Sequence, residues 1–132
     1  TPAHLVDIMA TCVDLAGGAY PEEVGGKEIV PMEGVSLRPM LTGEGALPER
    51  ALFWEHEGNA AIRVGDRKLV RLGGTGEWEL YDMGEDRTEI NDLAAERPEE
   101  ATALEERWRD WAKRAQVVPR PEKEAKKEAK KN

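Results

Sequence analysis

The residues around His56 are the part of this sequence best suited to chemistry. His56 stands between two carboxylates, Glu55 and Glu57, at the end of an expected strand, and Gly58 and Asn59 favour a sharp turn directly after it. Acidic neighbours favour the cationic imidazolium, and a cationic donor at a strand end is suited to holding an anionic group. The same spacing also fits a histidine that only caps a hairpin by bonding to Glu57 or to the backbone. The spacing alone leaves both interpretations open.

The sequence lacks the standard catalytic and metal-binding motifs. It contains no glycine-rich nucleotide loop, no HExxH pair and no CxxC pair. The two histidines, His4 and His56, are too far apart to suggest a zinc site by spacing. Nothing near Ser36, the only serine, resembles a nucleophile elbow. We therefore expect no catalytic residue and no metal ligand in this chain.

Three further features favour structural roles. His4 is expected to pack or form a hydrogen bond at the start of a helix. Cys12, the only cysteine, cannot form an internal disulfide, and its apolar helical surroundings predict a small buried side chain. The acid-rich stretch Asp82–Leu93 could bind a metal ion, but the favoured interpretation is a turn-rich connector whose side chains bond to the backbone.

Composition and charge restrict the classes of partner. The 132 residues suffice for one domain, and 35% of them are charged, with a formal net charge of −8. Residues 119–132 hold six basic residues and three glutamates, so the first 118 residues carry −11 and argue against nucleic-acid binding. For this tail we expect a disordered or frayed helical segment rather than a polyanion-binding site. No stretch approaches the roughly 20 apolar residues that span a bilayer.

The first 50 residues predict one helix followed by irregular chain. The helix is expected at Pro2–Ala16, and it is apolar on more than one side, so it needs cover that the following sequence cannot supply. Frequent Gly and Pro residues predict an irregular linker over residues 19–50. Within it, Ser36 would cap a short helical turn whose inward side chains are Leu37, Met40 and Leu41.

From residue 51 onward the pattern predicts an α+β fold, with a four-stranded antiparallel sheet packed by a carboxy-terminal helix. The strands are expected at residues 51–56, 60–64, 67–72 and 77–82. Alternation in the last strand places Trp78 and Leu80 on one face and Tyr81, with Glu77 and Glu79, on the other. A helix from Pro98 to about Val117 carries a narrow apolar seam suited to one face of the sheet; the seam consists of Ala101, Leu104, Trp108, Trp111 and Ala115.

Several blocks, taken in order, resemble the carboxy-terminal region of bacterial arylsulfatase-type sulfatases, members of the alkaline-phosphatase-like superfamily. The blocks are His4–Gly17, Glu33–Gly43, Phe53–Asn59, Arg63–Val70, Trp78–Asp82 and Asp86–Ala94. The specificity of the resemblance lies in the order of the blocks. It covers roughly residues 1–115, and the Lys-rich tail lies outside it.

This resemblance implies a two-part enzyme. A large α/β domain carries a formylglycine nucleophile and a calcium ion, and a smaller carboxy-terminal subdomain packs beside the site. Residues 1–18 would be the last helix of a truncated catalytic domain, 19–50 an irregular linker, 51–118 the subdomain and 119–132 the tail. Calcium and formylglycine are implied for the full-length parent, and neither is expected to be bound by this chain. The implied partners are the missing amino-terminal catalytic domain and a sulfate-ester substrate.

Little of the family's catalytic set matches this chain residue by residue. Cys12 is not followed by the C/S-x-P/A-x-R pattern from which formylglycine is made. His56 and Asn59 lie in a block that faces the substrate pocket in this family, so the resemblance implies that they contact the substrate. Two departures stand out: Ala60 occupies a place where Arg is common, and Arg67 a place where Trp is common.

The expected function is therefore that of a fragment of a sulfuric-ester hydrolase, which contributes one wall of the pocket and is inactive alone. Alternatives are a fragment of a related phosphate or phosphonate ester hydrolase and a non-catalytic carbohydrate- or protein-binding module. The apolar first helix and the long irregular stretch argue against the module. The resemblance implies a periplasmic or secreted parent, and no nucleic-acid or membrane partner is expected. We also expect the apolar face of the first helix to be poorly covered within this chain.

Overall fold

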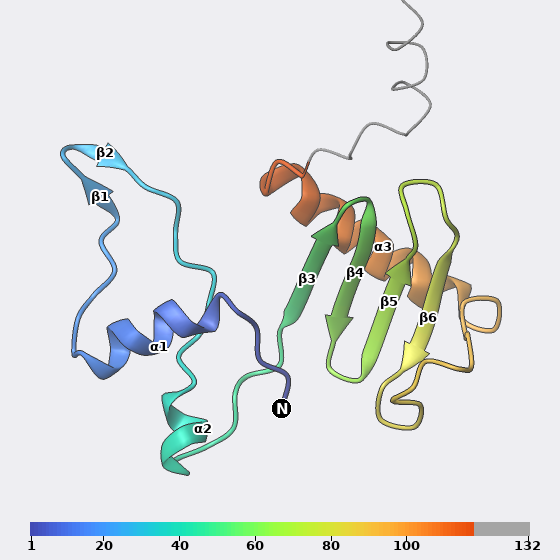
Figure 1. Ribbon diagram of the computed structural model, residues 1–132, viewed down its shortest axis with the longest axis horizontal. Helices are drawn as coiled ribbons and strands as arrows, with labels where there is room; N and C mark the ends of the chain where they lie inside the picture. The colour runs from blue at the N-terminus through green and yellow to red at the C-terminus, as the bar shows by residue number, and fades with distance from the viewer. Residues whose placement is uncertain (118–132) are drawn as a thin grey trace, which may run out of the picture. The chain divides into compact units, whose positions relative to one another are not determined.

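The computed structural model describes residues 1–117, and the chain divides into two compact units, Thr1–Glu49 and Arg50–Asn132. The first unit contains α1 (Asp7–Leu15), β1 (Glu23–Val24), β2 (Lys27–Glu28) and α2 (Arg38–Thr42). The second contains β3 (Ala51–His56), β4 (Asn59–Val64), β5 (Arg67–Arg71), β6 (Trp78–Asp82) and α3 (Pro98–Arg114) (Figure 1). The predicted α+β class, with one long helix on a four-stranded antiparallel sheet, is confirmed.

The first helix begins five residues later than predicted, at Asp7 rather than Pro2. The chain before it forms turns, in which the Asp7 backbone N–H donates to the His4 carbonyl oxygen at 3.0 Å. The Asp7 carboxylate in turn accepts the His4 backbone N–H at 2.7 Å. His4 therefore precedes the helix and is not part of its first turn. A carboxylate here also complements the positive end of the helix dipole.

The buried side of α1 is polar, because its polar side chains bond to the linker. Asp7 is completely buried, and its second carboxylate oxygen accepts the Val35 backbone N–H at 3.1 Å. The Thr11 hydroxyl accepts the Leu37 backbone N–H at 2.9 Å and donates to the Asp7 carbonyl oxygen. A Cβ on Gly34 would collide with the Val6 carbonyl oxygen, so the two segments approach backbone to backbone. The linker is thus fixed to α1 by hydrogen bonds rather than by apolar packing.

The apolar side of α1 is exposed, as expected from its unmatched stripe. The exposed fractions are 55% for Ile8, 58% for Met9 and 60% for Leu15. Cys12 is exposed on this helix as well. The predicted burial of Cys12 is therefore wrong. The prediction assumed that the apolar side of α1 is buried, and the described residues leave that side exposed.

The linker is mostly irregular, as predicted, with a two-stranded hairpin (β1 and β2) and the short helix α2 within it. Ser36 does bond to the start of α2, since its hydroxyl oxygen accepts the Arg38 backbone N–H at 3.2 Å. Met40 and Leu41 are 36% and 67% exposed, so their predicted inward orientation is wrong. The contacts that hold this segment to α1 are polar ones, from Asp14 to Ser36 and Arg38, and they do not bring Met40 and Leu41 inward.

The sheet of the second unit has the order β3-β4-β5-β6, with every neighbouring pair antiparallel. Its strands lie within one residue of the predicted bounds. The register aligns Phe53 with Ile62, Ile62 with Leu69, and Leu69 with Leu80. This row runs across the middle of the sheet and forms the floor of the core.

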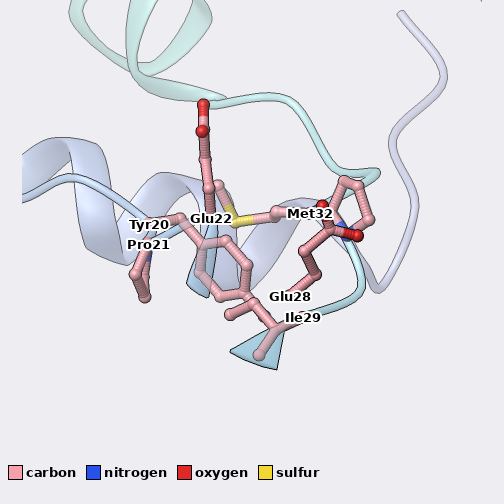
Figure 2. A pocket seen from close by; sticks show the side chains of 7 residues that line it. Tyr20, Pro21, Glu22, Glu28, Ile29 and Met32 are labelled. Carbon is pink, nitrogen blue, oxygen red and sulfur yellow. The ribbon is translucent and has the colours of Figure 1, made fainter. Parts of the chain in front are cut away.

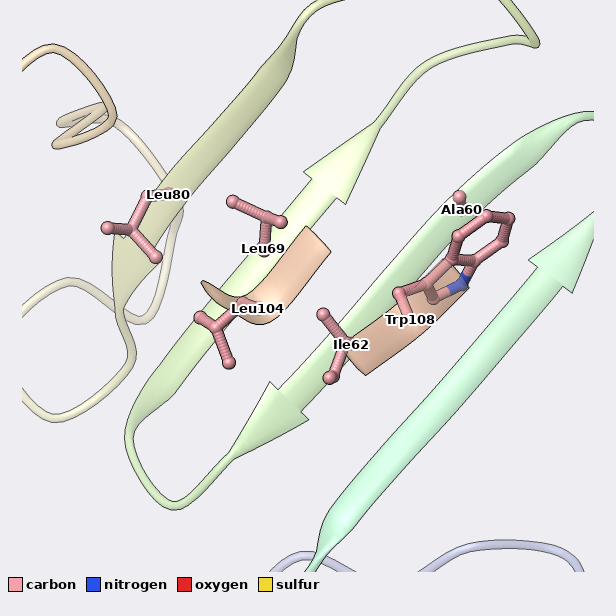
Figure 3. Close-up of a cluster of buried hydrophobic side chains, with 6 residues drawn as sticks. All are labelled: Ala60, Ile62, Leu69, Leu80, Leu104 and Trp108. Atoms are coloured by element: carbon pink, nitrogen blue, oxygen red, sulfur yellow. The ribbon is translucent and has the colours of Figure 1, made fainter. Parts of the chain in front are cut away.

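The helix α3 lies across one face of this sheet (Figure 1). Its residues Leu104 and Trp108 join Ala60, Ile62, Leu69 and Leu80 in one buried cluster (Figure 3). Leu104 and Trp108 of the predicted seam are buried, and Ala101 and Trp111 pack beside them. The seam was predicted too long, because α3 ends at Arg114 and Ala115 is exposed beyond it. The Trp108 indole N–H donates to the Trp54 carbonyl oxygen at 3.1 Å and ties the helix to β3. The predicted tail, residues 119–132, lies outside the described residues.

The connector after β6 covers part of the other sheet face. Tyr81, predicted to share a solvated face with Glu77 and Glu79, is only 6% exposed. Glu89 of the connector pairs with Lys68, the register partner of Tyr81, and the Asp92 carboxylate accepts the Leu80 backbone N–H. The alternation predicts the sheet face of Tyr81 correctly. The burial of Tyr81 depends on the connector after β6, which packs over that face.

The stretch Asp82–Leu93 is a turn-rich connector, as predicted. The Asp86 carboxylate accepts the backbone N–H groups of Ile90 and Asn91 at 2.7 and 2.8 Å. The hydrogen bond from Asn91 is the main reason that the pKa of Asp86 lies below its usual value. Within residues 1–117, no group of three or more His, Cys, Asp or Glu residues could hold a metal ion.

Candidate functional site

The candidate site is the hairpin that joins β3 to β4. His56 and Asn59 are register partners, and only Glu57 and Gly58 lie between them. Both turn residues have positive φ, +54° at Glu57 and +91° at Gly58. This is the pattern of a type I′ turn, whose twist matches that of the flanking strands. The turn therefore lies one residue earlier than predicted, and β4 begins at Asn59 instead of Ala60.

The turn is capped by Glu55, not by His56. The Glu55 carboxylate accepts the Gly58 backbone N–H at 2.8 Å. The His56 side chain is exposed, and within the described part of the chain it has no hydrogen-bond or ion-pair partner. The hairpin-cap interpretation of His56 thus loses its support, because the neighbouring glutamate fulfils that role.

Asn59 connects this hairpin to the glycine-rich loop between β5 and β6. Its side-chain oxygen accepts the Gly73 backbone N–H at 2.9 Å. A Cβ on Gly58 would lie 3.3 Å from the Gly74 backbone nitrogen, closer than most side-chain contacts. The two turns therefore touch through backbone atoms, which explains why a residue without a side chain is needed at Gly58.

His56 and Asn59 lie on the sheet face opposite α3. Strand alternation puts Ala60 on the other face, where it is 4% exposed and packs in the core with α3. The side chain of an arginine at position 60 would therefore project from the sheet face that α3 covers, and not from the face that carries His56. The departure at Ala60 thus does not remove a side chain from the face that His56 and Asn59 share.

The departure at Arg67 has a structural account. The Arg67 guanidinium bonds to Asp82 of β6 and, through Nε at 2.8 Å, to Glu100 of α3. The hydrogen bond from Arg67 holds the pKa of Asp82 below its usual value, and Asp82 raises the pKa of Arg67. These ion pairs join the sheet to the helix at the end of the sheet remote from His56.

The first unit contains a separate hollow of about 560 Å³ around the β1–β2 hairpin. Figure 2 shows the side chains of Tyr20, Ile29 and Met32 gathered in it, with Glu22 and Glu28 among the lining residues. No sequence pattern predicts this hollow, because irregular chain builds it. Its lining lacks histidine, cysteine and basic residues, so it offers no cationic group to hold an anion.

Sequence reasoning brought His56 and Asn59 together correctly as neighbours on one hairpin, and it missed two partners. One is the role of Glu55 in the turn, and the other is the contact of the hairpin with Gly73 and Gly74. The run of glycines from Gly73 to Gly76 was the available signal for a close backbone approach. No helix within residues 1–117 is long and apolar enough to cross a membrane.

The fold and site together define an α+β subdomain that presents a hairpin with an unpaired histidine at one end of its sheet. An uncharacterized sulfatase of Schizosaccharomyces pombe is 29% identical over 124 residues, covering 89% of this chain and 22% of that protein. An N-acetylglucosamine-6-O-sulfatase of Bacteroides thetaiotaomicron is 32% identical over 101 residues, covering 67% of this chain and 17% of that protein. The chain therefore spans about a fifth of the length of these relatives.

The structural comparison agrees with the sequence comparison. The structure of a 2-O GAG sulfatase superposes with a TM-score of 0.58 and 28% identity, covering 84% of this chain and 25% of the other. No protein-family model matches the sequence. The chain is similar to these sulfatases along most of its length and matches their carboxy-terminal region.

Proposed function

We propose that this chain forms the carboxy-terminal wall of the substrate pocket in a sulfuric-ester hydrolase of the arylsulfatase type. The observation that carries the proposal is the match to a sulfatase over 89% of this chain and only 22% of the relative. Two of the similar proteins are named for N-acetylglucosamine-6-O-sulfate and 2-O GAG sulfate chemistry. These names favour a sulfated saccharide as the substrate.

In this proposal His56 is a hydrogen-bond donor to the sulfate ester. Its side chain is exposed and has no partner within residues 1–117, so it is available to a ligand. Asn59 has a double role, because its oxygen holds Gly73 while its NH₂ group retains two donors for the substrate. Both side chains start from one face of a hairpin whose turn is fixed by Glu55.

The calcium ion and the formylglycine that the resemblance implies are assigned to the remainder of the longer protein. The described residues do not fit either group. The sequence after Cys12 lacks the formylglycine pattern, and residues 1–117 contain no cluster of three or more candidate metal ligands. We therefore derive no catalytic step from this chain beyond binding and orienting the ester. A periplasmic or secreted location of the longer protein is part of the same proposal.

The exposed face of α1 supports a contact with that remainder. Ile8, Met9 and Leu15 leave an apolar surface that is costly in water, at about 25 cal/mol for each Å². In the proposal residues 1–18 are the last helix of the catalytic α/β domain, which covers this surface. Residues 19–50 then lead to the subdomain.

The test compares the longer protein with the 132-residue chain, using an aryl sulfate and N-acetylglucosamine-6-sulfate as substrates. We expect turnover by the longer protein and none by the chain alone. In the longer protein His56→Ala should lower kcat/KM by about 10- to 100-fold, the loss of one hydrogen bond to a charged group. Glu44→Ala, an exposed linker residue, is the matched control and should leave kcat/KM unchanged. Turnover by the chain alone would contradict the wall role, and an unchanged His56→Ala enzyme would contradict the role of His56.

A further inference from the structure

A second group of polar side chains lies on the helix-covered face of the sheet, at the base of the glycine-rich loop. Arg71 and Trp78 are register partners and form the last pair of β5 and β6 before residues 72–77. The Arg71 guanidinium carbon lies 4.8 Å from the ring centroid of Trp78 and 5.4 Å from that of Trp108. The guanidinium thus lies against two neighbouring indole rings and makes cation–π contacts with both.

Arg71 differs from the other cations of the sheet in lacking a carboxylate partner. Arg63 pairs with Asp66, Arg67 pairs with Asp82 and Glu100, and Lys68 pairs with Glu89. For Arg71, the part of the chain that the structure describes supplies only the two rings. The contrast is informative because the sequence as a whole carries a net charge of −8, so carboxylates are abundant.

Two nitrogen atoms of this group are buried without an acceptor. Arg71 Nε and Trp78 Nε1 have no hydrogen-bond partner within residues 1–117. Buried donors are nearly always paired, because an unpaired one costs the free energy of its lost hydration. Two such donors on directly paired residues indicate that one acceptor group belongs between them.

We propose that Arg71 and Trp78 form a binding site for an oxyanion, a sulfate or carboxylate group, at the base of the loop 72–77. The guanidinium edge offers parallel N–H donors to two oxygens of such a group, and the indole N–H adds a third. The two ring contacts hold the guanidinium plane before the ligand arrives, so little side-chain entropy is lost on binding.

A ligand can reach the buried nitrogens only if the loop 72–77 moves. Gly73 and Gly74 have open space where a side chain would be, so this movement would displace no packed side chain there, although it would separate the loop backbone from Gly58. The Gly73 N–H of this loop also donates to the Asn59 side chain of the hairpin. The site is separate from the face of His56 and Asn59, because Arg71 and Trp78 share the face of Ala60 that α3 covers.

The test uses the full 132-residue chain, labelled with ¹⁵N, and sodium sulfate and sodium acetate as probes. Sodium chloride at matched ionic strength is the blank. The chain has four Trp residues, and Trp78→Phe identifies the indole N–H signal of Trp78. We expect the Trp78 indole and Arg71 Nε–H signals to shift saturably, with half-saturation on the order of millimolar. The stronger of the two responses distinguishes a sulfate site from a carboxylate site.

Variants separate binding from folding. Arg71→Lys keeps the charge but loses the forked donors, and we expect about tenfold weaker binding. Arg71→Met should abolish the saturable shift, while Arg63→Met, which removes a paired cation from the opposite face, should retain it. If Arg71→Met does not fold, Arg71→Lys and Trp78→Phe carry the comparison. Equal shifts with chloride, a linear response without saturation, or full binding by Arg71→Lys would each overturn the proposal.

Discussion

The hydrogen bond from Trp108 is a polar contact between α3 and β3, and a pair of Trp→Phe substitutions measures its contribution to stability. Trp108 is 7% exposed, and its indole N–H donates to the Trp54 carbonyl oxygen at 3.1 Å. Trp111 lies on the same helix and stacks on Phe53 with ring centroids 5.1 Å apart, without an indole hydrogen bond among residues 1–117. Both substitutions shrink the ring, but only Trp108→Phe removes a hydrogen bond.

The expected difference follows from the lost hydrogen bond. A net contribution of about 1 kcal/mol is typical, and a part-buried carbonyl oxygen left without its donor adds up to about 1 kcal/mol more. Trp108→Phe should therefore destabilise the chain by about 1–2 kcal/mol more than Trp111→Phe. For a domain of this size this corresponds to a Tm lower by roughly 4–8 °C for each kcal/mol.

Urea unfolding followed by far-UV circular dichroism measures both variants in the full chain. Equal m-values are required, because they show that both unfolding transitions expose the same surface. If Trp111→Phe costs as much as Trp108→Phe, or more, then ring packing rather than the hydrogen bond ties α3 to β3. The reasoning that links the helix to the strand carrying His56 would then be refuted.

Two further predictions concern the hairpin and the opposite sheet face. Gly58→Ala should lower the free energy of unfolding in urea by about 1–2 kcal/mol, because the φ of +91° at this residue disfavours a side chain. The control Gly74→Ala, at a position with open space, should lower it by less than about 0.5 kcal/mol. Equal losses in the two variants would contradict the assignment of the turn. The Tyr81 hydroxyl donates a hydrogen bond to the Glu79 carboxylate, and this raises the pKa of Tyr81 to about 12. The hydrogen bond therefore stabilises the fold fully below pH 10, and this stabilisation is lost as the pH rises toward 12. Tyr81→Phe should therefore lower Tm at pH 8 and lose this difference between pH 10 and 12, and a difference that stays constant across that range would disprove the link.

The sheet and α3 could be predicted because local patterns and tertiary contacts agree there. The alternation in residues 60–64 predicts an apolar sheet face, and the seam of Leu104 and Trp108 predicts an apolar helix face. In the structure these two faces pack against each other. The strand bounds follow from turn residues such as Gly65 and Asp66. Such agreement between levels is what makes an element readable from sequence.

The first helix was harder to predict because its burial runs against its hydrophobic pattern. The pattern correctly gave a helix and an uncovered apolar face, but it did not show that Asp7 and Thr11 bind the linker. Such contacts join residues 26 and 28 positions apart, and no periodicity encodes them. Tyr81 shows the same limit, since its burial depends on the later connector.

For the candidate site, residue type predicted the hairpin but not its contacts. The run from His56 to Asn59 indicated a turn with a histidine beside it, and the structure agrees on both points. It did not distinguish which neighbour caps the turn, because Glu55 and His56 are both able to bond to the backbone. Only the observed geometry assigns that role to Glu55.

The polar contacts of α1 have a consequence for the order of events during synthesis. Asp7, Thr11 and Asp14 bind residues 35–38, so these bonds become available only when residue 38 has followed α1 out of the ribosome. The segment from α1 to residue 38 can then complete its internal hydrogen bonds without covering Ile8, Met9 and Leu15 itself. Until another surface covers these side chains, the segment is structured but prone to aggregate, and chaperones recognise such exposed apolar side chains.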